Sequence, residues 1–178
     1  MSETKAIENW FARRVEAEAK KDVLSFSERV GDTVAALVIL LCLLFWFAHQ
    51  TSSSGFFTSK FGPAEVFWFY FPTVFGLVTN VAKVVVGRKN MLRPFETLET
   101  GLGAVGVVWL LVVFPFEFSH LADVLPDFLR FLLLWISNDV AKVLLVILII
   151  GFSAGTVYTA LMYVFVRRKL FKPTLKTA

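Results

Sequence analysis

The sequence has little of what a soluble, disulfide-bonded or thiol-liganded protein requires. It contains one cysteine, Cys42, which excludes a disulfide framework or a thiolate metal cluster within one chain. Only 18% of the residues are charged, against about 25% in a typical soluble domain, and 57% are hydrophobic. HExxH, P-loop, EF-hand and CxxC patterns are missing, as is any nucleophile–base set of recognisable spacing. We therefore predict a protein that is not an enzyme and whose apolar surface faces lipid.

Four apolar stretches are long enough to cross a bilayer. A hydrocarbon core of about 30 Å takes about 20 helical residues. Runs of this kind cover residues 33–49, 64–86, 101–119 and 139–166. They lack the alternation of membrane β-strands, whereas helices satisfy their own backbone hydrogen bonds in lipid. The sequence thus predicts an all-α integral membrane protein with a four-span bundle at residues 33–166.

Basic residues predict the orientation of these spans. Lysine and arginine concentrate in residues 1–32, in the loop between the second and third spans, and in the tail 167–178. The two remaining connections hold few basic residues. By the positive-inside rule, both termini lie on the cytoplasmic side of the cell membrane. Placed beside apolar segments, the net charge of +4 suits anionic lipid headgroups and not nucleic acid. The arginines expected to contact these headgroups are Arg13, Arg14, Arg88, Arg167 and Arg168.

Residues 1–32 are water-compatible and are expected to form an amphipathic cytoplasmic helix. Ile7, Trp10, Phe11 and Val15 fall on one helical face, with charges elsewhere. This face either lies on the inner leaflet or packs on the protein's own cytoplasmic loops, and the sequence does not distinguish the two. Because some thirty mostly polar residues precede the first apolar run, we expect no cleaved signal peptide.

The connection between the third and fourth spans, residues 121–137, is unusually apolar. It is too apolar for an ordinary loop and too short to span comfortably. We expect an outer interfacial helix that begins near Pro126 and Asp127 and ends before a cap at Ser137. Two alternatives remain open: a re-entrant loop that lines a pore, or fusion of Phe128 onward with the fourth span.

The second span carries a polar stripe. Thr73, Gly76, Asn80 and Lys83 share one helical face, and an ionisable group in a span must point away from lipid or reach the headgroups. The stripe either lines a polar pathway or makes a helix contact. In the second, commoner arrangement, Asn80 bonds a neighbouring helix and Lys83 reaches the inner headgroups beside Arg88.

Small residues predict where helices pack closely. Without a hydrophobic drive between helices in lipid, close backbone approach holds a bundle together. The expected packing positions are Gly103 and Gly106 in the third span and Gly151, Gly155 and Thr159 in the fourth. Small residues favour the inner halves of the spans and bulky aromatics the outer halves. We therefore expect a bundle that is tight on the cytoplasmic side and wider outside.

The two histidines, His49 and His120, fall at the outer ends of the first and third spans. Neutral imidazole is a common metal ligand, so the pair is a weak candidate for a metal or haem site. Interfacial histidines that bond water are far commoner, and we predict no cofactor.

Three functions follow from these features, in order of preference. The first is a channel or transport-type role in a homo-oligomer, with Asn80 and Lys83 near the pathway. The second is an accessory or scaffold subunit of a larger membrane complex, which docks through the small-residue face of the fourth span and the N-terminal helix. The third is a small redox protein with haem or metal at His49 and His120. The lipid bilayer is a partner in all three.

Overall fold

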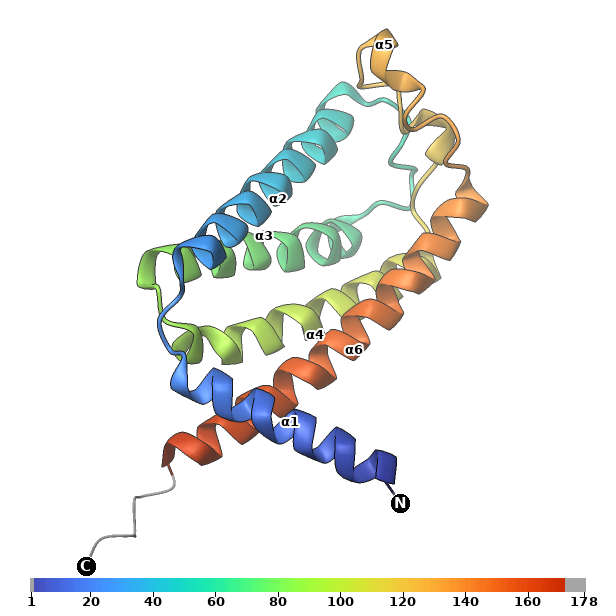
Figure 1. The fold of residues 1–178 in the computed structure, drawn as a ribbon. Coiled ribbons are helices and arrows are strands. Elements are labelled where there is room, and N and C mark those ends of the chain that lie inside the picture. The colour runs from blue at the N-terminus through green and yellow to red at the C-terminus, as the bar shows by residue number, and fades with distance from the viewer. Residues whose placement is uncertain (1, 172–178) are drawn as a thin grey trace, which may run out of the picture.

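The computed structural model describes the backbone of residues 2–171 and the side chains of residues 10–170. Most of the expected basic tail, 172–178, and the side chain of Ile7 lie outside the described part. The chain is all-helical, and its elements are α1 (Ser2–Lys20), α2 (Phe26–Ser52), α3 (Pro63–Val86), α4 (Lys89–Val113), η1 (Phe118–His120), α5 (Asp127–Arg130) and α6 (Asn138–Phe171) (Figure 1).

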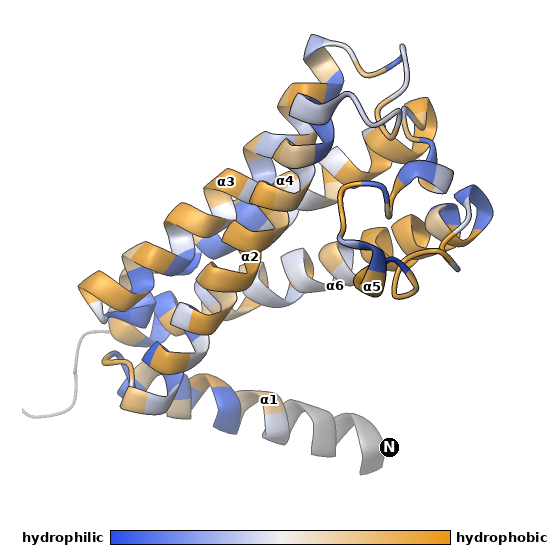
Figure 2. Cartoon of the chain, turned by 90° about the horizontal axis from the view of Figure 1, so that it is seen from above, coloured by the Kyte–Doolittle hydropathy of each residue, from blue (hydrophilic) through white to orange (hydrophobic). Residues whose placement is uncertain are grey.

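Four of these helices, α2, α3, α4 and α6, are long and apolar enough to cross a membrane. Long stretches of their ribbons are coloured as hydrophobic in Figure 2. The predictions of an all-helical chain and of four membrane-spanning helices are therefore confirmed in this coarse form.

Local signals explain where the spans begin and end. Before α2, the backbone N–H and the hydroxyl of Ser25 both donate to the Glu28 carboxylate, at 2.8 and 2.7 Å. Helix α3 begins with Pro63, whose fixed φ suits a first helical position. It ends at Gly87, whose φ of +66° lies in the left-handed region that glycine tolerates best.

Two elements differ from the sequence expectation. Helix α4 begins at Lys89, twelve residues before the predicted span 101–119, ends at Val113, and contains Pro94, which has no N–H to donate within the helix. The interfacial helix after Pro126 is shorter than expected: α5 has four residues, and turns follow it at residues 131–135.

Helix α4 lies at the centre of the packing. It contacts both α3 and α6, whereas α2 packs on α3 and makes little contact with α6. A Cβ at Gly106 would stand 2.8 Å from the Trp68 carbonyl oxygen of α3, and one at Gly103 2.8 Å from the Phe152 ring of α6. The absence of side chains at these glycines thus permits both contacts. Figure 1 shows α2 and α6 apart from each other, with α3 and α4 between them in this view.

Of the remaining predicted packing positions, two lie at a helix contact and one does not. Gly155 faces Thr100 of α4, with 3.7 Å between its virtual Cβ and the threonine methyl, and the Thr159 hydroxyl lies 3.5 Å from that of Thr100. Nothing lies within 4 Å of a Cβ built on Gly151. The structure therefore places Gly103, Gly106, Gly155 and Thr159 at helix contacts, and it places Gly151 on the open surface.

The two ends of the bundle have different chemistry. At the end that we call the basic end, α1 crosses α6 through Val15, Met162 and Val166, and the 21–25 linker pairs with the α3–α4 turn, where Leu24 N–H donates to the Gly87 carbonyl. At the opposite, aromatic end, Phe56 is buried among phenylalanines from the loops that follow α2 and α4.

We predict that Gly106→Ala destabilises the protein. The new methyl group would meet a backbone oxygen, which cannot rotate away, and overpacking of this kind costs about 1–3 kcal/mol. Gly151→Ala is the matched control: it meets open space and exchanges glycine for a better helix former. Thermal unfolding in detergent should give a lower Tm for Gly106→Ala and an equal or higher one for Gly151→Ala. Equal Tm values for the two variants would contradict the tight α3–α4 contact.

Candidate functional site: a groove between α2 and α6

A large cavity occupies the space between α2 and α6. Its volume is about 840 Å³, within the range of small-molecule sites. Helices α3 and α4 form its floor, and apolar side chains from α2, α6 and the 121–136 connection form its walls. Several wall residues are half exposed, including Leu41 at 64% and Leu148 at 47%. The cavity is therefore a groove that opens sideways between the two outer helices, toward the space that lipid would fill.

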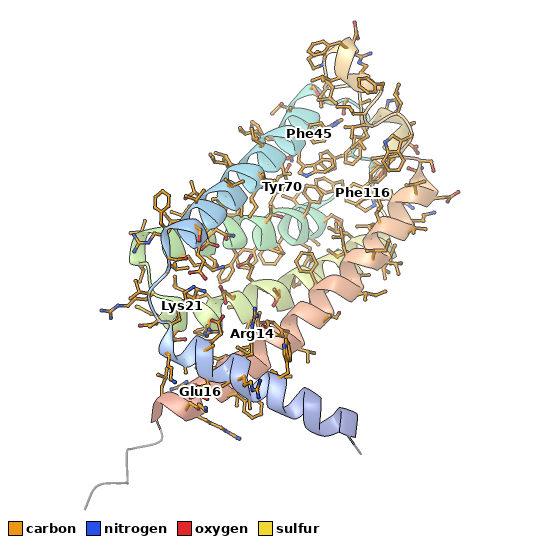
Figure 3. The ribbon with its side chains drawn as sticks, in the orientation of Figure 1. Arg14, Glu16, Lys21, Phe45, Tyr70 and Phe116 are labelled. Atoms are coloured by element: carbon orange, nitrogen blue, oxygen red, sulfur yellow. The ribbon has the colours of Figure 1, made fainter. Side chains whose placement is uncertain are left out.

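The aromatic end of the groove is closed by rings and by the 121–136 connection. Phe56, Phe116 and Phe118 line this end together with Leu125, Leu129, Leu132 and Leu133. Figure 3 shows Phe45 of α2 and Phe116 beside the space between α2 and α6, with Arg14, Glu16 and Lys21 at the basic end. The cavity volume is thus concentrated in the aromatic half and the middle of the bundle.

The other end of the groove contains one carboxylate. Glu99 of α4 is half buried and is the only charged residue in the lining. A Cβ built on Gly76 would lie 2.8 Å from the Oε1 atom of Glu99. The glycine therefore leaves room for the carboxylate. Lys83 of α3 lies near enough to attract the Glu99 carboxylate, whereas the hydroxyl of Thr79 donates to the Phe75 carbonyl of its own helix, at 2.9 Å. Among the described residues, no basic group lies within 4 Å of Glu99.

The predicted polar stripe of α3 faces this carboxylate and α4. Thr73 and Gly76 line the groove. The Asn80 side chain is buried and donates to the Gly76 carbonyl of its own helix, at 2.8 Å, so it does not bond a neighbouring helix as the commoner interpretation supposed. Lys83 forms an ion pair of 2.7 Å with Glu96 of α4, in place of a headgroup contact. The stripe therefore lies at a helix contact and also along the edge of a cavity.

A second, smaller cavity lies at the basic end. It has a volume of about 350 Å³, and charged side chains from α1, α2, α3 and α4 line it, among them Asp32, Lys83 and Glu96. Glu96 borders this cavity and Glu99, one helical turn further along α4, borders the groove. The Lys83–Glu96 pair thus stands at the boundary between a charged cavity and an apolar one.

Ion pairs connect the helices that line the smaller cavity. Glu28 at the start of α2 accepts from Lys89 at 2.5 Å and from Lys21 at 3.2 Å. Glu18 of α1 pairs with the buried Arg93 of α4 at 2.7 Å. These contacts join α1, α2 and α4, so helix α1 packs on the protein's own surface.

The predicted headgroup arginines gather at the basic end. Arg13, Arg14, Arg88, Arg167 and Arg168 are all exposed, on α1, the α3–α4 turn and the last turns of α6. Arg167 also bonds and stacks on Tyr163. On the same surface Lys20 donates a hydrogen bond to Glu16, which lowers the pKa of that carboxyl, and Lys169 adds to the effect from 3.7 Å.

The two histidines have separate partners. His49 is buried, and its Nδ1 lies 2.6 Å from the Ser54 hydroxyl while its Nε2 lies 3.0 Å from the Leu121 carbonyl oxygen. Both ring nitrogens are therefore already engaged in hydrogen bonds. His120 pairs instead with Asp123 at 2.8 Å. In the described part of the chain, no three His, Cys, Asp or Glu side chains are grouped as a metal site would require.

Sequence reasoning missed Glu96 and Glu99. It assigned residues 87–100 to a charged loop, because hydropathy falls there. A helical projection of residues 89–113 would have found them, since Glu96, Glu99 and Gly103 repeat at the three- and four-residue spacing of one helical face. The same projection places Glu99 on the face that also carries Gly106.

We predict that Lys83→Met destabilises the bundle, because it leaves Glu96 and Glu99 facing each other without a cation. The loss in unfolding free energy should be about 1–3 kcal/mol, between the values for exposed and buried pairs. Adding Glu96→Gln should recover part of it. Lys142→Met, which removes a half-exposed lysine 3.8 Å from Asp139, is the control and should have little effect. Equal losses in all three variants would contradict a specific role for the Lys83–Glu96 pair.

No protein-family model, curated protein or solved structure matches this chain.

Proposed function

We propose that this protein is a membrane carrier that binds a lipophilic or amphipathic small molecule in the groove between α2 and α6. The observation that carries the proposal is the cavity of about 840 Å³, whose lining is apolar except at one end. A groove open to the side suits a ligand that arrives through the bilayer.

The smaller, charged cavity supports transport as well as binding. It adjoins the groove across the Lys83–Glu96 pair, and its charged walls suit water. A polar head at the inner end of the groove would lie one helical turn from a water-compatible space. This arrangement favours a carrier over a channel, because the larger cavity has an apolar lining and would not hold a column of water.

We further propose that the basic end faces the cytoplasm, with both termini on that side of the cell membrane. The exposed arginines of α1, the α3–α4 turn and α6 support this orientation by the positive-inside rule. Their contact with anionic headgroups, and assembly into a homo-oligomer or a larger complex, remain predictions.

The orientation is tested by cysteine labelling of intact cells. In a Cys42→Ala background, Ser53→Cys, which follows α2 at the aromatic end, should react with a membrane-impermeant maleimide. Arg88→Cys at the basic end should react only after permeabilisation. The opposite pattern would overturn the orientation.

Carriage is tested in phosphatidylcholine vesicles with a fluorescent single-chain phosphocholine lipid, whose movement between leaflets is followed by dithionite quenching. We expect the reconstituted protein to raise the transfer rate several-fold above that of empty vesicles. Leu148→Trp should remove at least half of this gain, because it fills the groove from α6.

Ile147→Trp is the matched control, since Ile147 neighbours Leu148, is 57% exposed and does not line the groove. It should transfer the lipid at the rate of the unmodified protein. A rate equal to that of empty vesicles, or the same loss in both tryptophan variants, would refute the role of the groove.

A further inference from the structure

We propose that the groove selects amphipathic molecules with a cationic nitrogen head, which pairs with Glu99 while the apolar body lies between α2 and α6. This inference rests on the proposed function and names its class of ligand. It follows from where the one charged residue of the lining stands and from what surrounds it.

The carboxylate of Glu99 has space and an incomplete set of partners. Gly76 leaves room for it, and among the described residues no basic group lies within 4 Å of it. A carboxylate has about four lone-pair sites, so it can accept hydrogen bonds from a ligand. The nearest cation, Lys83, is already paired with Glu96 at 2.7 Å. With both carboxylates ionised, they and the one ammonium leave one net negative charge at the inner end of an otherwise apolar groove.

An ionisable group inside a membrane span is costly unless it is paired. A cationic head at Glu99 would supply the missing charge, and the surrounding apolar walls would strengthen the attraction relative to water. An anionic head at the same point would meet a like charge. Charge complementarity therefore favours amines over alcohols and excludes carboxylates.

The shape of the groove indicates a small molecule and not a transmembrane helix of a partner. Leu125, Leu129 and Leu132 of the connection line its aromatic end, and Ile39, Gly76 and Phe152 line the end near Glu99. A helix long enough to cross the bilayer would meet this connection. A single alkyl chain or a drug-sized ring system fits between the two ends, with its head toward the smaller charged cavity.

The chain provides its own reporter for this site. Cys42 is the single cysteine, is exposed and lines the groove from α2. In phosphatidylcholine vesicles, its alkylation by N-ethylmaleimide is timed with added dodecylamine, dodecanol or dodecanoate, which share one chain and differ in the charge of the head. Val38→Cys in a Cys42→Ala chain serves as the control for effects on the bilayer, since Val38 lies one turn away, is 53% exposed and is not in the lining.

We expect an amphiphile that binds in the groove to slow the alkylation of Cys42 and to leave the alkylation of Val38→Cys unchanged. Dodecylamine should protect at a concentration about tenfold lower than dodecanol, as a charge-assisted pair would produce, and dodecanoate should protect least. In Glu99→Gln, which keeps the size of the side chain, the amine and the alcohol should become equal within about twofold.

Two further variants separate the possible causes. Gly76→Ala, whose methyl group would push on the Glu99 carboxylate, should also reduce the preference for the amine, and it tests the proposal if Glu99→Gln fails to fold. Asp139→Asn removes an equal charge from a side chain that is 95% exposed and should keep the full preference.

The outcomes distinguish this inference from the proposed function. If amine and alcohol protect Cys42 equally in the unmodified protein, the groove binds amphiphiles and cation selection by Glu99 is refuted. If none of the three protects Cys42, the proposed function fails as well. If Cys42 is unreactive from the start while Val38→Cys reacts, a second copy or a partner helix fills the groove, and both proposals are overturned.

Discussion

The close packing of α4 against two neighbours is the constraint on which the rest of the structure depends. Gly106 lets α4 approach the backbone of α3, and Gly103 lets it receive the Phe152 ring of α6. Because α4 fills the middle, α2 packs mainly on α3, and α2 and α6 are held apart. The groove is the space that this arrangement leaves. Glu99 enters it because it lies on the same face of α4 as these glycines, one turn before Gly103.

The sequence predicted the number and helical nature of the spans because long apolar runs have few other solutions. It predicted their boundaries less well where polar residues continue a helix. Lys89 and Glu96 resemble a loop in hydropathy, yet they belong to α4, since Glu28 of α2 and Lys83 of α3 pair with their charges. Such partners are distant in the chain, so a single sequence cannot reveal them.

For the same reason, only part of the candidate site could be predicted from the sequence. The stripe on α3 is periodic within one helix and could be found from spacing alone. The groove exists because α2 and α6 lie apart, and residue spacing within a single helix does not predict how far apart two helices lie. The glycine pair of α6 illustrates the limit: Gly155 lies at the contact with Thr100, whereas Gly151, four residues earlier, meets open space. The pattern indicated close packing without indicating which glycine takes part.

Helix α2 is anchored at both ends. At one end Glu28 holds Lys89, and Leu24 bonds Gly87. At the other, His49 reaches the Leu121 carbonyl and Gln50 accepts from Tyr70. Between these anchors no residue of α2 is buried. A helix held at both ends can bend in its middle but cannot move away from the bundle as a whole. If the groove binds a ligand as proposed, these end contacts fix its length, so it would discriminate among ligands by how long they are.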